Sequence, residues 1–383
     1  MRCRTLINLL SKYNDHNIIA ALKYNPKTIV FIRYKSQQNK NIFMEVKKVI
    51  QKQLPGTEII DRVISAGNPQ KLEDIIKEYA DKDTIINLSG GSKISSIIAY
   101  KVAIEKNIVS VVVDLKGKGF YKIQGKSIEL QREPFTELKV DEIISTSGAA
   151  IVEHSTDYYH SDECVELLNY VMNNFEQWKI VKDILRDKDI VSIDKDEPLK
   201  VSLDLRHINK ANSSELKDFI GGMNIRGFII KCTFFSERVD FGFRDIGIKR
   251  FILTSGIWLE ALTYKLVDNI EEVDDIKSGV LFEWDRDLKH VRNEVDVVAA
   301  VDSTLMCISC KDTEKYDVEE LNELQVYSEK LGGEDVKKIL VASREPLRQE
   351  LVMERAEEMN INVIIFNGDV KLFQSRLRDI VLK

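Results

Sequence analysis

Three features are scarce in this sequence: cysteine, long apolar runs and an excess of positive charge. The five cysteines are scattered, odd in number and mostly set in apolar surroundings: Cys3, Cys164, Cys232, Cys307 and Cys310. This distribution argues against a disulfide framework and predicts reduced core thiols in a cytoplasmic protein. Cys307 and Cys310 have CxxC spacing, but no second pair accompanies them, so we expect no zinc site there.

No apolar run approaches the roughly 20 residues that a helix needs to span a bilayer, and the N-terminal segment lacks a signal-peptide cleavage pattern. The net charge of −6 argues against indiscriminate coating of nucleic acid. A local basic site is still compatible with it, because the first fifty residues hold ten Lys or Arg against two Asp or Glu. The 383 residues allow two or three domains, and we expect no membrane partner.

The first 130 residues alternate between strand and helix patterns. Apolar segments at 28–32, 84–88 and 109–113 are typical of buried strands, and amphipathic segments at 39–53 and 69–80 are typical of helices. This alternation predicts a doubly wound, mostly parallel α/β sheet. Ligands of such sheets bind at the carboxyl ends of the strands.

Two polar loops follow strands of this predicted sheet. The first, Ser89 to Lys93, has two glycines that allow close backbone approach, and the helix after it offers free N–H groups to an anion. It lacks the Walker A spacing, and a plain strand-to-helix turn explains it about equally well. The second loop, 11–17, would lie beside it. His16 in that loop has the chemistry of a general base, but we assign it no catalytic role.

The doubly wound pattern, the polar first loop and the run Asn87-Leu88-Ser89-Gly90-Gly91-Ser92-Lys93 resemble a CARF domain over about residues 1–145. Such domains are sensor modules of CRISPR ancillary proteins and bind cyclic oligoadenylates across a homodimer interface. The resemblance favours cyclic tetraadenylate as the activator. It implies a pocket lined by Ser11, Asn14, Asp15, Asn17, Ser89, Gly90, Gly91, Ser92 and Lys93.

A hairpin pattern at 293–311 organises the last third of the chain. Two β-branched, apolar runs flank the turn Asp302-Ser303-Thr304, so the pairing brings Asp296 and Lys311 together at the open end. An acid and a lysine at an apolar rim are costly without partners, and a divalent metal and a phosphate would supply them. Taken alone, the pair is explained about equally well by a surface salt bridge at a sheet edge, and the residues around the hairpin favour the metal and phosphate.

The elements around the hairpin resemble the PD-(D/E)XK nuclease fold over residues 246–383. Helical patterns at 250–267, 316–331 and 347–359 alternate with strand patterns at 338–342 and 362–365. The resemblance implies that Glu260, Asp296 and Lys311 form a catalytic site that cleaves DNA, RNA or both with Mg²⁺ or Mn²⁺.

One position departs from the family pattern. Ser309 stands where the family has a carboxylate, two residues before the lysine, and a hydroxyl does not replace that charge at a metal. In some enzymes of this fold the missing acid comes from the following helix, which makes Glu323 the candidate for both a catalytic and a metal-binding role. Further possible ligands are Glu319, Glu320, Glu283 and the backbone carbonyl of Cys310.

Together the two resemblances imply a homodimeric nuclease of type III CRISPR antiviral defence that cyclic oligoadenylate activates. Residues 146–245 are either a connector or the start of the effector domain, with helices expected at 162–185 and 213–220 and a strand at 228–239. Two alternatives stay open. One is a ligand-responsive regulator that binds DNA, although no basic recognition helix stands out. The other is a catalytically inactive nuclease-like module that only binds nucleic acid.

Overall fold

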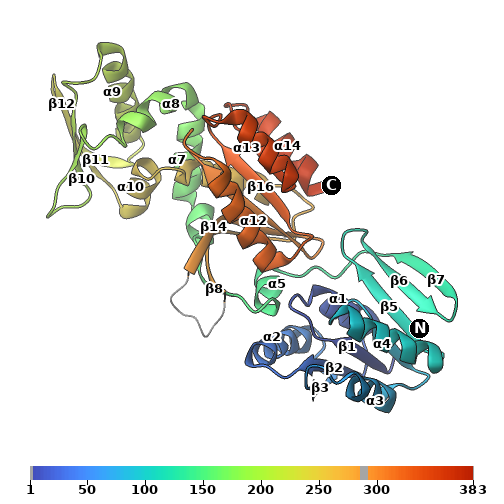
Figure 1. Cartoon of the computed structure of the whole chain (residues 1–383). Helices are drawn as coiled ribbons and strands as arrows, with labels where there is room; N and C mark the ends of the chain where they lie inside the picture. Colours follow the sequence, from blue (N-terminus) through green and yellow to red (C-terminus); the bar gives the residue numbers. More distant parts are fainter. Residues whose placement is uncertain (1–2, 285–291, 383) are drawn as a thin grey trace.

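The computed structural model describes residues 3–284 and 292–382, which form three units along the chain (Figure 1). The N-terminal unit (residues 3–135) contains a seven-stranded sheet, and the C-terminal unit contains a six-stranded sheet. A middle unit (residues 162–245) with a four-stranded sheet extends away from the C-terminal unit on the side opposite to the N-terminal unit. No helix in the described ranges is long and apolar enough to cross a membrane.

The N-terminal unit is the doubly wound sheet that the sequence predicts. The strand order is β3-β2-β1-β4-β5-β6-β7, with the first five strands parallel and the last two antiparallel. The strands are β1 (Thr5–Leu9), β2 (Thr28–Tyr34), β3 (Glu58–Ile64), β4 (Thr84–Asn87), β5 (Val109–Asp114), β6 (Gly119–Gln124) and β7 (Ser127–Arg132). The helices are α1 (Asp15–Tyr24), α2 (Gln37–Gln53), α3 (Pro69–Tyr79) and α4 (Lys93–Glu105).

Helices cover both faces of this sheet, which explains why its central strands are apolar throughout. The apolar side chains of α1 and α2 share one buried cluster with one face, and those of α3 and α4 share another with the opposite face. The chain turns back between β1 and β4, so the loops that follow these two strands lie side by side at the topological switch point.

The six-stranded sheet of the C-terminal unit has the order β17-β16-β15-β14-β13-β8. Its strands are β8 (Ala150–Glu153), β13 (Asp275–Glu283), β14 (Arg292–Val301), β15 (Thr304–Lys311), β16 (Lys337–Ala342) and β17 (Ile361–Ile365). Its helices are α5 (Val140–Thr146), α6 (Thr156–His160), α10 (Ile246–Leu253), α11 (Ile257–Asp268), α12 (Val318–Gly332), α13 (Gln349–Glu358) and α14 (Val370–Leu382). The segment 146–245 therefore supplies the edge strand β8 as well as the middle unit.

The predicted hairpin is the centre of this sheet. β14 and β15 are antiparallel and joined at Asp302 and Ser303, which both have positive φ, as the tight turn of a two-residue hairpin requires. Helices α11 and α12 pack on opposite faces of the hairpin. Sequence patterning predicts one helix over 250–267, whereas the structure has α10 and α11, separated at Gly256, whose φ of 92° a continuous helix cannot contain.

The middle unit consists of α7 (Asp162–Asn173), α8 (Phe175–Ile184), α9 (Lys210–Ile225) and the antiparallel strands β9 (Val191–Ile193), β10 (Lys200–Asp204), β11 (Ile229–Phe234) and β12 (Arg238–Phe243). Two expectations for this region are wrong. The strand at 228–239 is a hairpin of β11 and β12. The helix does not stop at Gly221-Gly222, because Gly222 serves close packing: a Cβ there would lie 2.3 Å from the hydroxyl oxygen of Tyr170.

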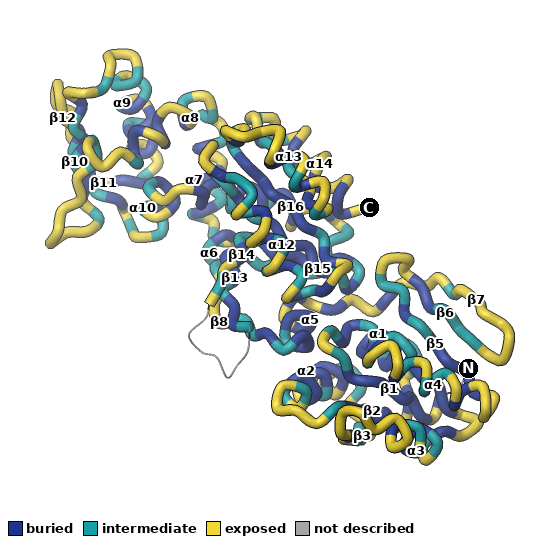
Figure 2. Tube along the Cα trace, viewed as in Figure 1, coloured by how far each residue is buried: buried dark blue, intermediate teal, exposed yellow. Residues whose placement is uncertain are grey.

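Two clusters of buried residues each extend from one unit into the next, and Figure 2 marks the buried residues along the chain. One apolar cluster joins the α1–α2 face of the N-terminal unit to the α12 face of the six-stranded sheet. A second joins the middle unit to the α11 face, and Trp178 and Trp258 lie fully buried within it. The six-stranded sheet is therefore held between the other two units, one against each face.

Candidate functional site

The open end of the β14–β15 hairpin places Asp296 beside Cys310 and Lys311. The backbone ladder stops at Val297 and Ile308, and the Asp296 carboxylate then accepts the N–H of Cys310 at 2.6 Å. The Asp296 carboxylate thus replaces the backbone oxygen that would accept the next hydrogen bond of the ladder. This bond holds the Asp296 side chain at the point where the two strands separate. The register confirms that the hairpin brings its two ends together.

Two glutamates add negative charge beside Asp296. Burial raises the pKa of Glu260 to about 8, and the charges of Asp296 and Glu294 add to that rise. The Tyr159 hydroxyl donates to Glu260 at 2.9 Å and works in the other direction. The negative charge of Glu294 adds to the rise in the pKa of both Glu260 and Asp296, so the site favours either protons or a cation.

The pKa of Asp296 is also raised, although it has favourable partners. Burial is the main cause, and it outweighs the hydrogen bond from Cys310 and the positive charge of Lys311. Ser309 donates its hydroxyl to the same carboxylate at 3.3 Å. Ser309, at the position where the resemblance to the PD-(D/E)XK fold predicts a second acid, is therefore a weak hydrogen-bond donor to Asp296 and brings no charge of its own.

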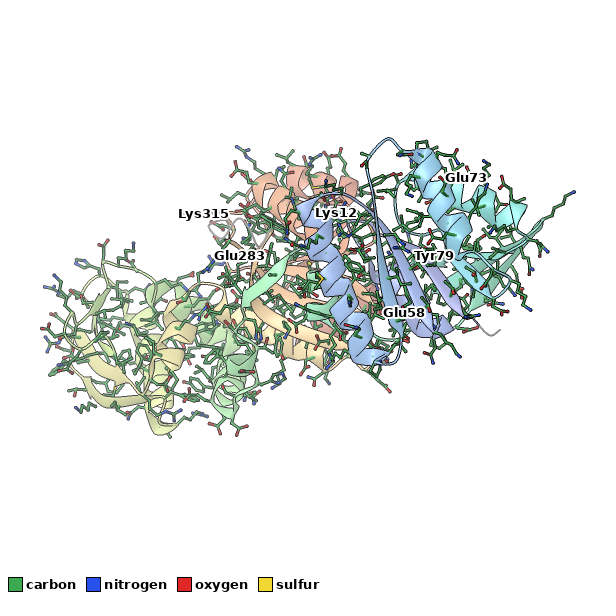
Figure 3. The ribbon with its side chains drawn as sticks, turned by 90° about the horizontal axis from the view of Figure 1, so that it is seen from below. Lys12, Glu58, Glu73, Tyr79, Glu283 and Lys315 are labelled. Carbon is green, nitrogen blue, oxygen red and sulfur yellow. The ribbon has the colours of Figure 1, made fainter. Side chains whose placement is uncertain are left out.

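The structure does not bring every predicted ligand to this point. Glu323 is exposed on α12, where its charge acts on Tyr327, whereas Glu283 is buried and accepts a hydrogen bond from Arg292 at 3.1 Å. Figure 3 labels Glu283 at the end of β13. Glu294 lies with Glu260 and Asp296 in an acidic cluster. Its position two residues before Asp296 on the same strand places both side chains on one face, which is the pattern in the sequence that indicates it.

The cysteines contribute thiols to the core. Cys307 lies in the cluster under α12 and Cys310 in the cluster under α11, so the two side chains face opposite sides of the sheet. Within residues 3–284 and 292–382, no three His, Cys, Asp or Glu side chains converge as a complete metal-ligand set. Oxygen ligands from the acidic cluster and the Cys310 carbonyl would therefore need water and substrate oxygens to complete a coordination shell.

In the N-terminal unit, the loops after β1 and β4 are joined by four buried asparagines: Asn8, Asn14, Asn17 and Asn87. Asn87 donates to Asn8 at 3.1 Å and to Asn17 at 3.0 Å, and Asn17 donates to Asn14 at 2.9 Å. Because neutral amides both donate and accept, this network satisfies its members without burying charge. The predicted pocket residues Asn14 and Asn17 thus have their side chains committed to holding the two loops together.

Gly90 explains how the loops fit so closely. A Cβ at this position would lie 2.1 Å from the backbone oxygen of Leu9, so only glycine permits the contact. Ser92 then caps α4 by accepting the N–H of Ser95, and Ser92 and Lys93 are exposed at the start of that helix. The exposed part of the predicted pocket is therefore the first turn of α4.

Two titratable side chains lie at the start of α1. Burial raises the pKa of Asp15 to about 7 and lowers the pKa of His16 to about 4. His16 lies 3.3 Å from the Ser11 hydroxyl. Both groups are therefore biased towards their neutral forms in this loop.

The same loop contacts the C-terminal unit directly. The Tyr13 hydroxyl donates to the backbone oxygen of Glu329 in α12 at 2.5 Å, and its ring packs on Gly333. Asn14 donates to the backbone oxygen of Thr146 in α5 at 3.1 Å. Figure 3 labels the neighbouring Lys12 at this boundary.

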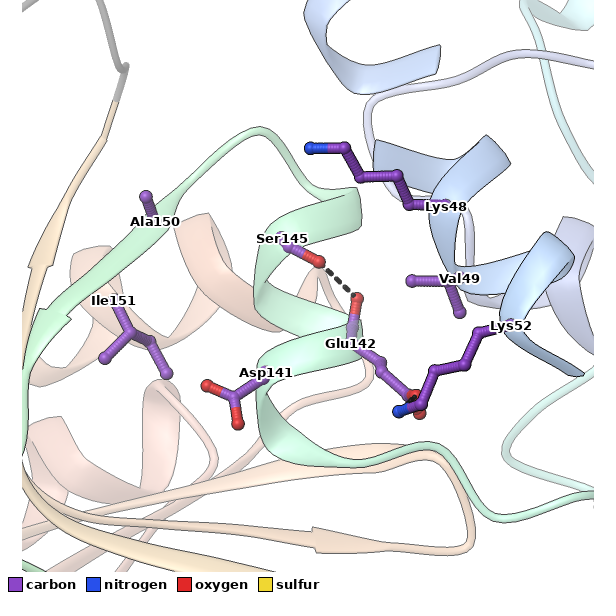
Figure 4. Close-up of a pocket in the computed structure, with 8 residues that line it drawn as sticks. All are labelled: Lys48, Val49, Lys52, Asp141, Glu142, Ser145, Ala150 and Ile151. Carbon is purple, nitrogen blue, oxygen red and sulfur yellow. Dashed lines mark hydrogen bonds and ion pairs between the residues drawn. The ribbon is translucent and has the colours of Figure 1, made fainter. Parts of the chain in front are cut away.

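A cleft of about 320 Å³ lies nearby between α2 and α5 (Figure 4). Lys52 of α2 reaches across it to Glu142 of α5 at 2.9 Å, whereas Asp141 of α5 points away from α2 and pairs with Lys277 at 3.1 Å. The boundary between the N-terminal and C-terminal units thus contains a polar cleft beside the apolar cluster that the two units share.

The comparisons with known proteins agree with this architecture. Residues 248–383 match the family model described as Card1-like, endonuclease domain. The chain joins a doubly wound N-terminal unit to an endonuclease-like C-terminal unit. No curated protein matches the chain in sequence.

Solved structures resemble the whole chain. Protein VC1899 from Vibrio cholerae has a TM-score of 0.72 at 17% identity, with 99% of this chain and 96% of that chain covered. Can2 from Sulfobacillus thermosulfidooxidans, solved in complex with cyclic tetra-adenylate, has a TM-score of 0.70 at 17% identity, with 99% of both chains covered. A type III CRISPR defence DNA nuclease activated by cyclic oligoadenylate has a TM-score of 0.55 at 12% identity, and 98% of this chain spans 52% of that one. These likenesses establish the three-unit fold.

Proposed function

We propose that this protein is a metal-dependent endonuclease that cyclic tetraadenylate activates in type III CRISPR defence, cutting DNA, RNA or both. The observation that carries the proposal is the end of the β14–β15 hairpin, where Asp296, Lys311 and Glu260 gather inside the region that matches the endonuclease model. A structural salt bridge at a sheet edge would not need Glu260, a further carboxylate whose pKa burial raises.

Asp296, Glu260 and the carbonyl of Cys310 would hold Mg²⁺ or Mn²⁺. The donor set fits, because Mg²⁺ is commonly bound by one or two carboxylates and completes its shell with water and phosphate oxygens. The raised pKa values of Glu260 and Asp296 support this reading: burial is the main cause, repulsion between carboxylates adds to it, and a nearby cation would offset both by favouring the charged forms. A bound divalent ion would polarise the scissile phosphate and lower the pKa of a water molecule.

The remaining chemistry belongs to the chain itself. Lys311 would hold the attacking water by hydrogen bonding and offset negative charge on the phosphate as the bond breaks. The Cys310 N–H keeps Asp296 turned towards this point. Tyr159 would hold Glu260 in place and share its proton when no cation is present.

The N-terminal unit would bind the activator at the loops that follow β1 and β4. The exposed first turn of α4, with free backbone N–H groups and Lys93, suits phosphates, and Ser11 and Ser92 offer hydroxyls for hydrogen bonding. The asparagine network would hold the two loops beneath the bound activator in a fixed position. Ring size is inferred from the likeness to a structure that contains cyclic tetra-adenylate.

A second copy of the chain would complete this pocket. Ile94, Ile97 and Ile104 are exposed on α4, while Ala99 and Val102 on the same helix are buried against the sheet. A helix that is apolar on both sides is normally covered on both sides. The apolar outer face of α4 supports a homodimer in which one ring-shaped ligand contacts both N-terminal units.

Cleavage of supercoiled plasmid, single-stranded DNA and single-stranded RNA with Mn²⁺ tests the proposal, with and without cyclic tetraadenylate and alongside Lys311→Ala. We expect cleavage that requires both the activator and Lys311. Calorimetric titration of cyclic tetraadenylate measures the sensor separately. Cleavage without an activator requirement would refute the sensor assignment, and ligand binding without any cleavage would refute the nuclease assignment.

The second candidate function is a nuclease-like module that only binds nucleic acid. Ser309 favours it, because this hydroxyl replaces a carboxylate and donates to Asp296 at 3.3 Å. Restoring the acid with Ser309→Glu separates the two candidates. An inactive natural chain that gains cleavage in this variant would support the binding module.

A further inference from the structure

A fully buried carboxylate follows Lys311 directly in the chain. The Asp312 side chain has no exposed surface, and it receives hydrogen bonds or ion pairs from four side chains. Lys182 and Ser343 bind one carboxylate oxygen, while Arg186 at 2.7 Å and the Trp258 indole N–H at 2.5 Å bind the other.

These four donors come from three separate parts of the fold. Lys182 belongs to α8 and Arg186 follows it, so both come from the middle unit. Trp258 lies on α11, two residues before Glu260, and Ser343 follows β16. The backbone N–H of Ser343 also donates to the carbonyl of Lys311 at 3.0 Å. Asp312 is thus the point at which the middle unit, the helix of Glu260 and the strand of Lys311 are tied together.

The ion-pair cluster carries two cations against one carboxylate. Although burial acts to raise the pKa of Asp312, the charges of Lys182 and Arg186 hold it below its usual range. Stability alone is a weak reason for such a cluster, because burying charges costs about as much as their attraction returns. What the cluster does supply is a fixed position, since a carboxylate held from three directions cannot shift or turn.

We propose that Asp312 is a positioning residue that fixes Lys311 and the Cys310 N–H at the nuclease centre, which makes the middle unit a required part of that centre through Lys182 and Arg186. This inference rests on the proposed nuclease function. Lys311 and Cys310 precede Asp312 on the same strand end, so a displaced Asp312 would move the ammonium of Lys311 and the hydrogen bond to Asp296 together. Small displacements of catalytic groups are costly in rate, about a hundredfold for an ångström.

The test uses Asp312→Asn in the full-length chain, which keeps the shape and removes the charge. Well below its unfolding temperature, we expect a fall in kcat of roughly ten- to a hundredfold with KM unchanged. In a Lys311→Ala background the same substitution should reduce any residual cleavage by a smaller factor, because only the part of its effect that acts through the Cys310 N–H remains. Asp61→Asn is the matched control, since it breaks the Arg33–Asp61 pair in the N-terminal unit and should leave kcat unchanged.

Hydrogen exchange provides a readout that does not depend on cleavage. Asp312→Asn should speed exchange in residues 308–313 while the β1–β2 region exchanges as in the parent chain. The positioning role would be overturned if Asp312→Asn lowered the unfolding temperature but left kcat unchanged. If the parent chain does not cleave, unchanged hydrogen exchange in residues 308–313 would overturn it. If the parent chain does not cleave but exchange still speeds locally, the proposed function fails and the positioning of Lys311 stands. Should Asp312→Asn fail to fold, Ser343→Ala removes one neutral donor and is expected to show the same pattern more weakly.

Discussion

The asparagine network of the N-terminal unit and the acidic cluster at the end of the β14–β15 hairpin offset the cost of burying polar groups in different ways. The loops after β1 and β4 are joined by neutral amides, and each of Asn8, Asn17 and Asn87 has a partner of matching polarity. The proposed nuclease centre instead gathers Glu260, Glu294 and Asp296, and the charge of Glu294 adds to the burial that raises the pKa of Glu260 and of Asp296. The first centre is complete within the chain, and the second needs a further positive charge.

The difference fits a rigid role for the first centre and the reactive role proposed for the second. A satisfied amide network resists movement and can support a ligand without changing its own protonation. Crowded carboxylates are unfavourable in the isolated protein and become favourable when a cation arrives, which is how functional sites differ from structural ones. The contact of Tyr13 with α12 connects the first kind of centre to the unit that holds the second.

The largest expected effect comes from removing charge at the nuclease centre. Asp296→Asn retains an acceptor for the Cys310 N–H but removes the charge that a metal requires, so cleavage should fall by about a thousandfold or more. Its unfolding temperature at pH 8 should stay equal or rise, because a repulsive partner of Glu260 is lost. Glu350→Gln, on the exposed side of α13, is the control. Undiminished cleavage by Asp296→Asn would remove the acid from the site.

In the N-terminal centre the corresponding change should damage stability. Asn17→Ala deprives Asn87 and Asn14 of partners inside the protein, and we expect a loss of about 2–4 kcal/mol in the free energy of opening. Hydrogen exchange of β1 and β4 measures it. The exposed Asn224→Ala should change nothing. A loss in the free energy of opening below about 0.5 kcal/mol would mean that the asparagine network adds little to the stability of the N-terminal unit.

Stability against pH separates the two centres further. The pKa of Glu260 in the folded chain is about 8, above its unfolded value, so the folded state binds more protons between these values. Stability from this group is therefore full at low pH and is lost as pH rises towards 8. Glu260→Gln should abolish that loss and be more stable than the parent chain at pH 8 by about 1–3 kcal/mol, and equal at pH 5.

The parent chain itself provides the control for this prediction. Adding Mn²⁺ at pH 8 should raise its unfolding temperature and leave that of Glu260→Gln almost unchanged, because the cation replaces protons only where Glu260 can ionise. Parallel stability curves for the two proteins from pH 5 to 8 would place the titration elsewhere, with Asp15 as the next candidate.

The smallest expected effect concerns the link between the centres. Tyr13→Phe removes one hydrogen bond to the backbone of α12, worth about 1 kcal/mol. We expect activator affinity by calorimetry to change little, whereas the activator-dependent rise in cleavage should fall about three- to tenfold. Tyr121→Phe, in β6, is the matched control. An unchanged response would show that activation travels by another route, such as the Asn14–Thr146 contact.

Local patterning in the sequence was enough for most of the fold. Continuous apolar strands predicted the parallel sheet, and the hairpin with its turn at Asp302 and Ser303 formed as expected, because burial and turn geometry depend on near neighbours. Patterning failed where a glycine has a tertiary purpose. Gly222 lies within a helix, where the missing side chain leaves room for the Tyr170 hydroxyl, whereas Gly256 separates two helices. The sequence alone does not distinguish these two roles of glycine.

The site shows the same division. That Asp296 and Lys311 lie at the same end of the hairpin was predictable, because the pairing of two adjacent strands is a local event. Glu283 and Glu323 were named by type and spacing, and only the fold shows Arg292 at the first and solvent at the second. The sequence by itself thus determined the hairpin that carries the proposed chemistry. The tertiary structure decided which distant charges reach it, because Glu260 meets the hairpin only when α11 packs on the sheet, and Lys182 and Arg186 only when the middle unit packs against it.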